Sequence, residues 1–167
     1  MSSGAEEHVE VRCATVADAG AIARLLYDFN REFGDPTPPP EALADRVRLV
    51  VGSGESMVLL AGAGPDGLAL LRFRPAIWSA GTECYLAELY VVPERRGRGI
   101  GRALMNESIA QARLRGADNM DLGTGESDVA ARALYESLGF TNREGGSAGP
   151  AMLYYELALA DDGASGA

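Results

Sequence analysis

The chain has 167 residues, 47% of them hydrophobic and 23% charged, which is the composition of one soluble globular domain. Its formal net charge of −9 argues against a nucleic-acid partner, because nucleic-acid-binding proteins gather positive charge on one surface. No apolar run reaches the ~20 residues that span a bilayer, so no membrane partner is expected. Residues 1–7 have neither the basic nor the apolar region of a signal peptide, which predicts a cytoplasmic protein.

We expect one domain over residues 9–159, between disordered tails at residues 1–8 and 160–167, where small and polar side chains dominate. The only histidine, His8, lies in the first tail, which argues against a histidine-based catalytic triad. Cys13 and Cys84 lie in strand-like segments and match no metal-binding pattern. We therefore expect two buried thiols and no metal.

The first half of the domain has the pattern of a strand followed by two helices. Residues 9–14 are typical of a strand, and residues 16–33 have a helical apolar face. Thr15 is a candidate N-cap for this helix, with Asp18 as the carboxylate three residues later. Prolines at residues 36–40 end the helix, and a second one is expected near residues 41–51.

The second half alternates strands and helices. Strands are expected at residues 57–62 and 67–75, joined by a Pro-Asp-Gly turn, and at residues 82–92. A helix over residues 99–115 and a short strand at 119–122 follow, and Ser127 or Asp128 caps a further helix that Gly139 ends. Closing strands are expected at 140–142 and 151–159. The order β-α-α-β-β-β-α-β-α-β-β predicts an α/β (α+β layered) fold.

The segment with the clearest functional signal is residues 96–101, which read RGRGIG between a strand and a helix. A helix start leaves backbone N–H groups unpaired and carries the positive end of the helix dipole. Glycines let such a backbone approach a ligand closely. The segment therefore predicts an anion site, typically for phosphate. The alternative is an ordinary strand-to-helix connection with solvated arginines.

The common nucleotide-binding patterns are absent. No P-loop string occurs, and the glycines of residues 97–101 do not have the dinucleotide spacing. That spacing does occur at Gly62, Gly64 and Gly67, but a second strand follows it where a helix is required. A hairpin turn is the better interpretation of that segment, and an unrelated nucleotide-binding regulator is disfavoured.

The remaining pattern, Arg/Gln-x-x-Gly-x-Gly/Ala, resembles the acetyl-CoA loop of the GNAT superfamily of N-acetyltransferases. The preceding strand end, with Leu89, Val91 and Pro93, resembles the family's Leu-x-Val-x-Pro segment. Residues 131–140, ARALYESLGF, look like the family's Ala-x-x-Leu-Tyr-x-x-x-Gly-Phe element. The resemblance covers most of residues 9–158. It implies a mixed, mostly antiparallel sheet flanked by helices, in which the fourth and fifth strands splay apart around the pantetheine arm.

The resemblance implies an acyltransferase that moves an acetyl group from acetyl-CoA to a primary amine of a small molecule or peptide, by direct attack in a ternary complex. The alternative is a non-catalytic GNAT-fold module that binds acyl-CoA. The resemblance to this family also implies that the protein forms a homodimer. The residues to which the resemblance assigns cofactor binding are Leu89, Tyr90, Val91, Arg96, Gly97, Arg98, Gly99, Ile100, Gly101, Arg102 and Asp128. Among them, the Val91 amide is the implied oxyanion donor.

Two catalytic residues are expected. By resemblance, Tyr135 is the general acid that protonates the departing thiolate, and the alternative is a core tyrosine. Glu88 is the candidate base, because a carboxylate in an apolar strand is unfavourable unless it is functional or paired. The alternative for Glu88 is an ion pair with Arg72 or Arg74.

Two further expectations concern the surroundings of these residues. Strand alternation places Glu88 on one face with Leu86 and Tyr90, and places the competing candidates Glu83 and Tyr85 on the other. Asp128 stands where the family often carries asparagine, and an ionised carboxylate cannot donate a hydrogen bond. A cap role for Asp128 would survive this change.

The acceptor site is expected between the first two helices and the fourth strand. An acidic, partly aromatic lining there would suit a cationic amine. The residues that could form it are Asp28, Phe29, Asn30, Glu32, Phe33, Asp35 and Trp78. The identity of the amine does not follow from the sequence.

Overall fold

The computed structural model describes residues 9–159. They fall into two compact units, one ending at Leu122 and the other beginning at Gly123, and each is described by itself. The tails expected at residues 1–8 and 160–167 lie outside the described residues, and the single domain over 9–159 stays a prediction. Within the described residues, no helix is both long and apolar enough to cross a membrane.

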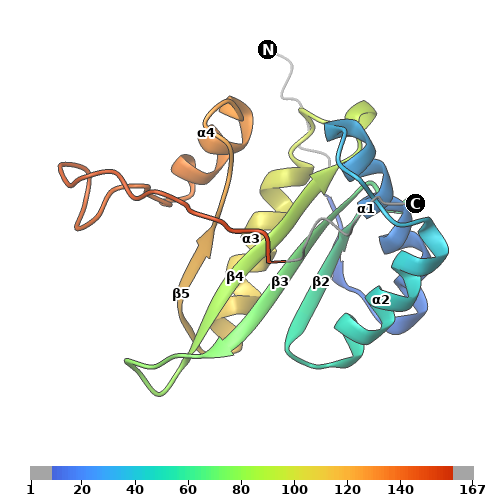
Figure 1. Ribbon diagram of the computed structural model, residues 1–167, viewed down its shortest axis with the longest axis horizontal. Coiled ribbons are helices and arrows are strands. Elements are labelled where there is room, and N and C mark those ends of the chain that lie inside the picture. Colours follow the sequence, from blue (N-terminus) through green and yellow to red (C-terminus); the bar gives the residue numbers. More distant parts are fainter. Residues whose placement is uncertain (1–8, 160–167) are drawn as a thin grey trace, which may run out of the picture. The chain divides into compact units, whose positions relative to one another are not determined.

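The first unit contains one five-stranded sheet with the order β1-β2-β3-β4-β5 (Figure 1). Each of the first four strands pairs antiparallel with the next one along the chain, and β5 pairs parallel to β4. This confirms the predicted mixed, mostly antiparallel sheet. The strands are β1 (Val11–Cys13), β2 (Ser56–Ala61), β3 (Gly67–Pro75), β4 (Thr82–Val91) and β5 (Ala117–Leu122).

Helices cover both faces of this sheet. The helices of the first unit are η1 (Val16–Asp18), α1 (Ala19–Phe33), α2 (Pro40–Gly52), η2 (Pro93–Arg95) and α3 (Ile100–Leu114). Side chains of α1 and α2, including Ile22 and Val47, pack in one buried cluster with Leu60, Leu68 and Leu70 of β2 and β3. Helix α3 buries Leu104 and Met105 against the opposite face, and it lies behind the strands in Figure 1.

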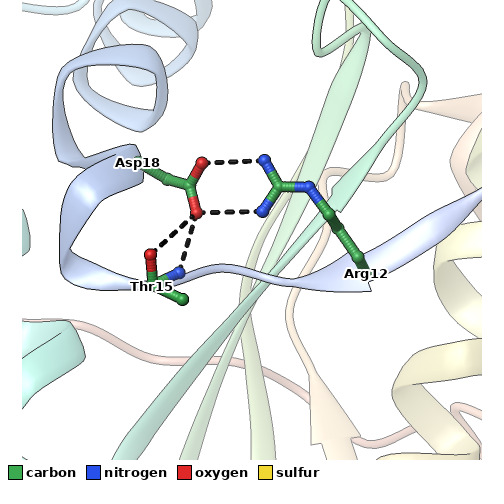
Figure 2. Close-up of polar contacts among 3 residues, drawn as sticks. All are labelled: Arg12, Thr15 and Asp18. Carbon is green, nitrogen blue, oxygen red and sulfur yellow. Dashed lines mark hydrogen bonds and ion pairs between the residues drawn. The ribbon is translucent and has the colours of Figure 1, made fainter.

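A polar contact fixes the chain between β1 and α1 (Figure 2). Arg12 and Asp18 form an ion pair of 2.7 Å, and the Thr15 backbone N–H donates to Asp18 at 2.8 Å. The Arg12 guanidinium, followed by the Thr15 N–H, holds the pKa of Asp18 well below its usual range. Thr15 and Asp18 therefore form the N-terminal cap that the sequence predicts.

A β-bulge in β4 decides which side chains face α1 and α2. Leu71 pairs with Leu86 while Leu70 pairs with Glu88, so Ala87 is an extra residue in β4. Because each step along a strand changes the face, the extra residue reverses the alternation beyond it. The expectation that Glu88 shares a face with Leu86 is therefore wrong. The residues on the face of Leu70, which is the α1/α2 face, are Arg72, Arg74, Glu83, Tyr85, Glu88 and Tyr90.

The second unit contains helix α4 (Val129–Ser137). The Asp128 side chain accepts a hydrogen bond from the Ala131 N–H at 3.2 Å, and Gly139 follows the helix with φ of +94°. The predicted cap and the predicted end of the helix are confirmed.

The two predicted closing strands, 140–142 and 151–159, are not formed. A strand needs a hydrogen-bonded neighbour, and the described part of this unit offers one isolated bridge, between Arg143 and Ala151. A glycine-containing loop at residues 145–149, with positive φ at Gly145 and Gly146, follows Arg143. The apolar side chains beyond the bridge remain exposed, among them Leu153 and Tyr155.

Candidate functional site

The edge of β4 that faces β5 is open over its last residues. Pairing with β5 ends at Leu86, and no other strand of the described chain lies against this edge beyond it. On the opposite side, the Val92 N–H donates to the Asp66 carbonyl at 2.9 Å. Antiparallel alternation then points the N–H groups of Leu89 and Val91 toward the open edge and that of Tyr90 toward β3. The open edge thus offers two backbone donors.

The loop over residues 96–101 continues from this edge. Gly97 and Gly99 have φ of +73° and +82°, and a Cβ on either would meet nothing within 4 Å. Glycine is therefore required by the backbone conformation, and the surface above it is open. Gly99 is the N-cap of α3 and provides no side chain to cap it. Across the described residues, no hydrogen bond uses the amides of residues 97–101. These donors and the helix dipole favour an anion.

The arginines around this loop have different partners. Arg95 pairs with Asp66 at 3.3 Å, and Arg96 is held by Glu32. Arg98 is exposed, and the structure records no ion pair for it within residues 9–159. Arg102 lies exposed in the first turn of α3. Of the three loop arginines 95, 96 and 98, Arg98 is the one best able to meet a phosphate.

Arg96 joins two distant parts of the first unit. Its two terminal nitrogens each lie 2.7 Å from an oxygen of Glu32, and its Nε donates to the Val91 carbonyl at 2.9 Å. The guanidinium also lies 5.7 Å from the centre of the Tyr90 ring, which stacks on Phe29 at 5.1 Å. Arg96 lowers the pKa of Glu32. Sequence reasoning missed this contact, since Glu32 and Arg96 are 64 positions apart and no local pattern relates them.

A cleft of about 550 Å³ lies beside this contact, between the end of α1 and the end of β4. Of the predicted acceptor residues, Asp28 and Glu32 line it. Trp78 does not line the cleft, because it lies in the hairpin that joins β3 to β4. That hairpin is next to Thr82, where β4 begins, and the cleft is next to Val91, where β4 ends. The complete lining is Tyr27, Asp28, Arg31, Glu32, Tyr90, Val92, Pro93 and Glu94.

Glu88 lies half-buried on the same sheet face as Tyr90. Burial raises its pKa above the ordinary glutamate value, and Arg72 opposes this shift. Arg74 does not pair with Glu88, since its Nε lies 2.5 Å from a carboxylate oxygen of Glu83. Within the described chain, no ion pair of Glu88 is recorded, so a protonatable carboxyl group remains on this face.

The other two predicted site residues, Tyr135 and Asp128, belong to the second unit. Tyr135 is buried and contacts the Phe140 ring edge-on, with 6.0 Å between the ring centres. Burial, and secondly Asp128, raises the pKa of Tyr135 to about 12. The phenol therefore keeps its proton at neutral pH, which is the form that a general acid requires.

Known proteins resemble this chain in sequence and in fold. Residues 22–140 match the model of the Acetyltransferase (GNAT) family. A solved structure from Arthrobacter sp. FB24, assigned to the acetyltransferases, is 42% identical with a TM-score of 0.82, covering 95% of this chain and 99% of that one. A mycothiol acetyltransferase of Thermobispora bispora is 36% identical over 121 residues.

An aminoglycoside N(6')-acetyltransferase type 1 of Stenotrophomonas maltophilia is 32% identical over 80% of this chain and 87% of its own length. The mycothiol acetyltransferase match covers 70% of this chain but only 35% of that protein, so this chain spans about a third of it. The family model and the Arthrobacter structure extend over most of the chain, and the likeness to the Arthrobacter structure extends to the fold. The chain therefore belongs to the GNAT family of acetyltransferases.

Proposed function

We propose that this chain transfers an acetyl group from acetyl-CoA to a primary amine of a small molecule or peptide, by direct attack in a ternary complex. The proposal rests on one observation: two groups of backbone N–H donors follow each other along the chain, the first at the end of β4 and the second in the loop after it. The N–H groups of Leu89 and Val91 face an open strand edge, and the amides of residues 97–101, for which the described part of the chain provides no acceptor, follow directly.

The residues fit acetyl-CoA on chemical grounds. The loop amides and Arg98 suit the pyrophosphate, because donors at a helix start and a free guanidinium both favour anions. The β4 edge at Leu89 and Val91 suits the amide-containing pantetheine arm, which binds like an added strand. When bound, acetyl-CoA supplies the activated acetyl thioester.

The side chains then have distinct tasks. The Val91 N–H donates to the oxygen that becomes negative as the amine attacks. Glu88 accepts the amine proton through water, and its raised pKa makes it a stronger base than an exposed carboxylate. Tyr135 donates its proton to the leaving thiolate.

The cleft beside β4 suits a cationic group of the acceptor. Its lining includes Arg31 and Glu32, which already pairs with Arg96, but also the carboxylates of Asp28 and Glu94 and the aromatic rings of Tyr27 and Tyr90. The aminoglycoside and mycothiol acetyltransferases among the relatives are named for amine-bearing small molecules or their products. The homodimer and the cytoplasmic location inferred from the sequence stay predictions.

One observation favours a second function, a GNAT-fold module that binds acyl-CoA without catalysis. The family often carries asparagine at the position of Asp128, and here the carboxylate caps α4 instead. An intact Tyr135 favours the enzyme. The two functions differ in one measurable respect, which is release of free CoA in the presence of an amine.

Isothermal titration with acetyl-CoA, against free CoA, ATP and NAD, tests the cofactor site. We expect micromolar binding of acetyl-CoA that Gly99→Glu weakens, because a carboxylate there repels the phosphates. Thiol release with a panel of amines then tests transfer. Binding without release from any amine supports the non-catalytic module, and a folded protein that binds neither acetyl-CoA nor CoA refutes both functions.

A further inference from the structure

A strip of polar side chains continues along the α1/α2 face of the sheet, beyond its apolar cluster. Across β3 and β4, Glu88 lies opposite Leu70, and Tyr85 lies opposite Arg72. Leu70 and Tyr90 belong to the buried cluster, whereas Arg72 is exposed and Tyr85 half-buried. Glu88 therefore marks the border between the core and the polar strip, and it is the β-bulge that places it there.

Two arginines of β3 lie on this strip, and among the described residues a carboxylate partner is recorded for one of them. Arg74 forms an ion pair of 2.5 Å with Glu83 directly across the sheet. For Arg72, two residues earlier on the same face, the structure records no ion pair among residues 9–159. Acidic residues outnumber basic ones 24 to 15 in this chain, so a shortage of carboxylates does not explain the difference.

The residues directly opposite Arg72 on its own face are neutral. Ser56 of β2 lies opposite it on one side, and Tyr85 of β4 lies opposite it on the other. The two diagonal neighbours of Arg72 on β4 are acidic, and such pairs in a sheet lie about 7 Å apart: Glu83 already pairs with Arg74, and Glu88 is the other. Arg72 acts on Glu88 electrostatically without forming an ion pair. A guanidinium that is exposed to solvent and has no recorded ion pair among the described residues is suited to bind an external carboxylate.

We propose that Arg72 binds a carboxylate of the acceptor, so that the acceptors of this protein are aminocarboxylates whose amine lies at Glu88 and whose carboxylate lies at Arg72. The inference rests on the proposed acetyl transfer and narrows its substrate class. The amine and the carboxylate of the acceptor then span the distance between two neighbouring positions on one face, about 7 Å. Arg72 is a specificity-determining residue in this arrangement, and Glu88 receives the amine proton.

The test compares each aminocarboxylate with its carboxamide, which keeps the amine and removes the negative charge. Suitable acceptors are 4-aminobutanoate and 6-aminohexanoate, and glycine is the short comparator whose amine and carboxylate are too close together to reach both positions. The ratio of kcat/KM for the acid to that for the amide is measured in the wild type, in Arg72→Gln and in the matched control Arg74→Gln. Taking the ratio cancels the different reactivities of the amines. Titration of the same acceptors into protein saturated with free CoA measures binding without turnover.

We expect Arg72→Gln to lower the acid-to-amide ratio about tenfold and to weaken binding of the acid by a similar factor, as for loss of a charged hydrogen bond. Arg74→Gln should leave the ratio within about twofold of the wild type, since Glu83 already neutralises Arg74. An unchanged ratio in Arg72→Gln, or an equal fall in both variants, overturns the inference.

Other outcomes separate the two proposals. Transfer to polyamines or aminoglycosides but to no aminocarboxylate refutes the role of Arg72 and leaves the proposed function standing. Failure to bind acetyl-CoA, or to release CoA with any amine, refutes the proposed function and the inference with it.

Discussion

The ion pair between Glu32 and Arg96 connects the end of α1 to the strand edge that presents the Val91 amide. Glu32→Gln removes the charge and keeps the size of the side chain. Arg96 then loses its bidentate ion pair with Glu32. Its hydrogen bond to the Val91 carbonyl can still form, and this bond becomes the contact that keeps Arg96 in position. We expect the variant to fold and to hold this edge less firmly.

The effect on stability should be small. The side chains of Arg96 and Glu32 are 45% and 29% exposed, so solvent screens the pair and we expect a loss of about 0.5–1 kcal/mol in the free energy of unfolding. For a protein of this size, such a loss lowers Tm by about 1–4 °C. A matched control is Asp45→Asn, which breaks an exposed ion pair with Arg48 of 2.6 Å on α2, away from the site.

The effect on catalysis should be larger. Removing an oxyanion donor lowers kcat by about 10²–10³-fold. In Glu32→Gln the Val91 N–H is still present but is held less firmly, so we expect kcat to fall about tenfold. The KM for acetyl-CoA should change less than about twofold, because the loop amides that suit the pyrophosphate are not altered. Steady-state thiol release and thermal melts measure both effects. An equal fall in kcat for Asp45→Asn and Glu32→Gln, or an unchanged kcat with a lower Tm for Glu32→Gln, would refute this role of the ion pair.

Three further predictions concern protons. Tyr135→Phe should lower kcat about 10²-fold with little change in acetyl-CoA affinity by calorimetry, and a matching loss of affinity would contradict the role of general acid. Because the pKa of Glu88 is raised, the rate should fall on acidification at a higher pH than for an ordinary glutamate, and the pH profile of Glu88→Gln should lack this limb. Asp18 has a lowered pKa, so its stabilising effect is present above the unfolded value of about 3.9 and is lost as the pH falls below it. Urea unfolding should therefore show Asp18→Asn to be destabilised relative to wild type at neutral pH and progressively less so below pH of about 4, whereas a constant difference would refute the assignment.

Much of the fold could be predicted from the sequence because its elements have local causes. The apolar period of α1, the Thr15 and Asp18 cap, and the proline at the start of α2 each act within a few residues. The loop over residues 96–101 was predicted for the same reason, since the required positive φ is a property of Gly97 and Gly99 themselves.

What the sequence did not reveal depends on contacts between distant segments. The bulge at Ala87 has no signature of its own, because it results from how β3 and β4 pair, and it reverses the face predicted for Glu83 and Tyr85. Cys13 was expected to be buried and is exposed, since β1 is an edge strand. The predicted closing strands have strand-like composition, but composition alone does not supply the neighbour that a strand needs.

The open edge of β4 has a consequence for how the protein behaves when it is purified. A strand edge with unpaired N–H and C=O groups is a template on which another chain can add, and this is a common start of aggregation. A molecule that pairs with Leu89 and Val91 covers these groups, and by mass action it also shifts the folding equilibrium toward the native state. If acetyl-CoA binds this edge as proposed, acetyl-CoA or CoA in the storage buffer should act as a protectant and prolong the shelf life of the protein.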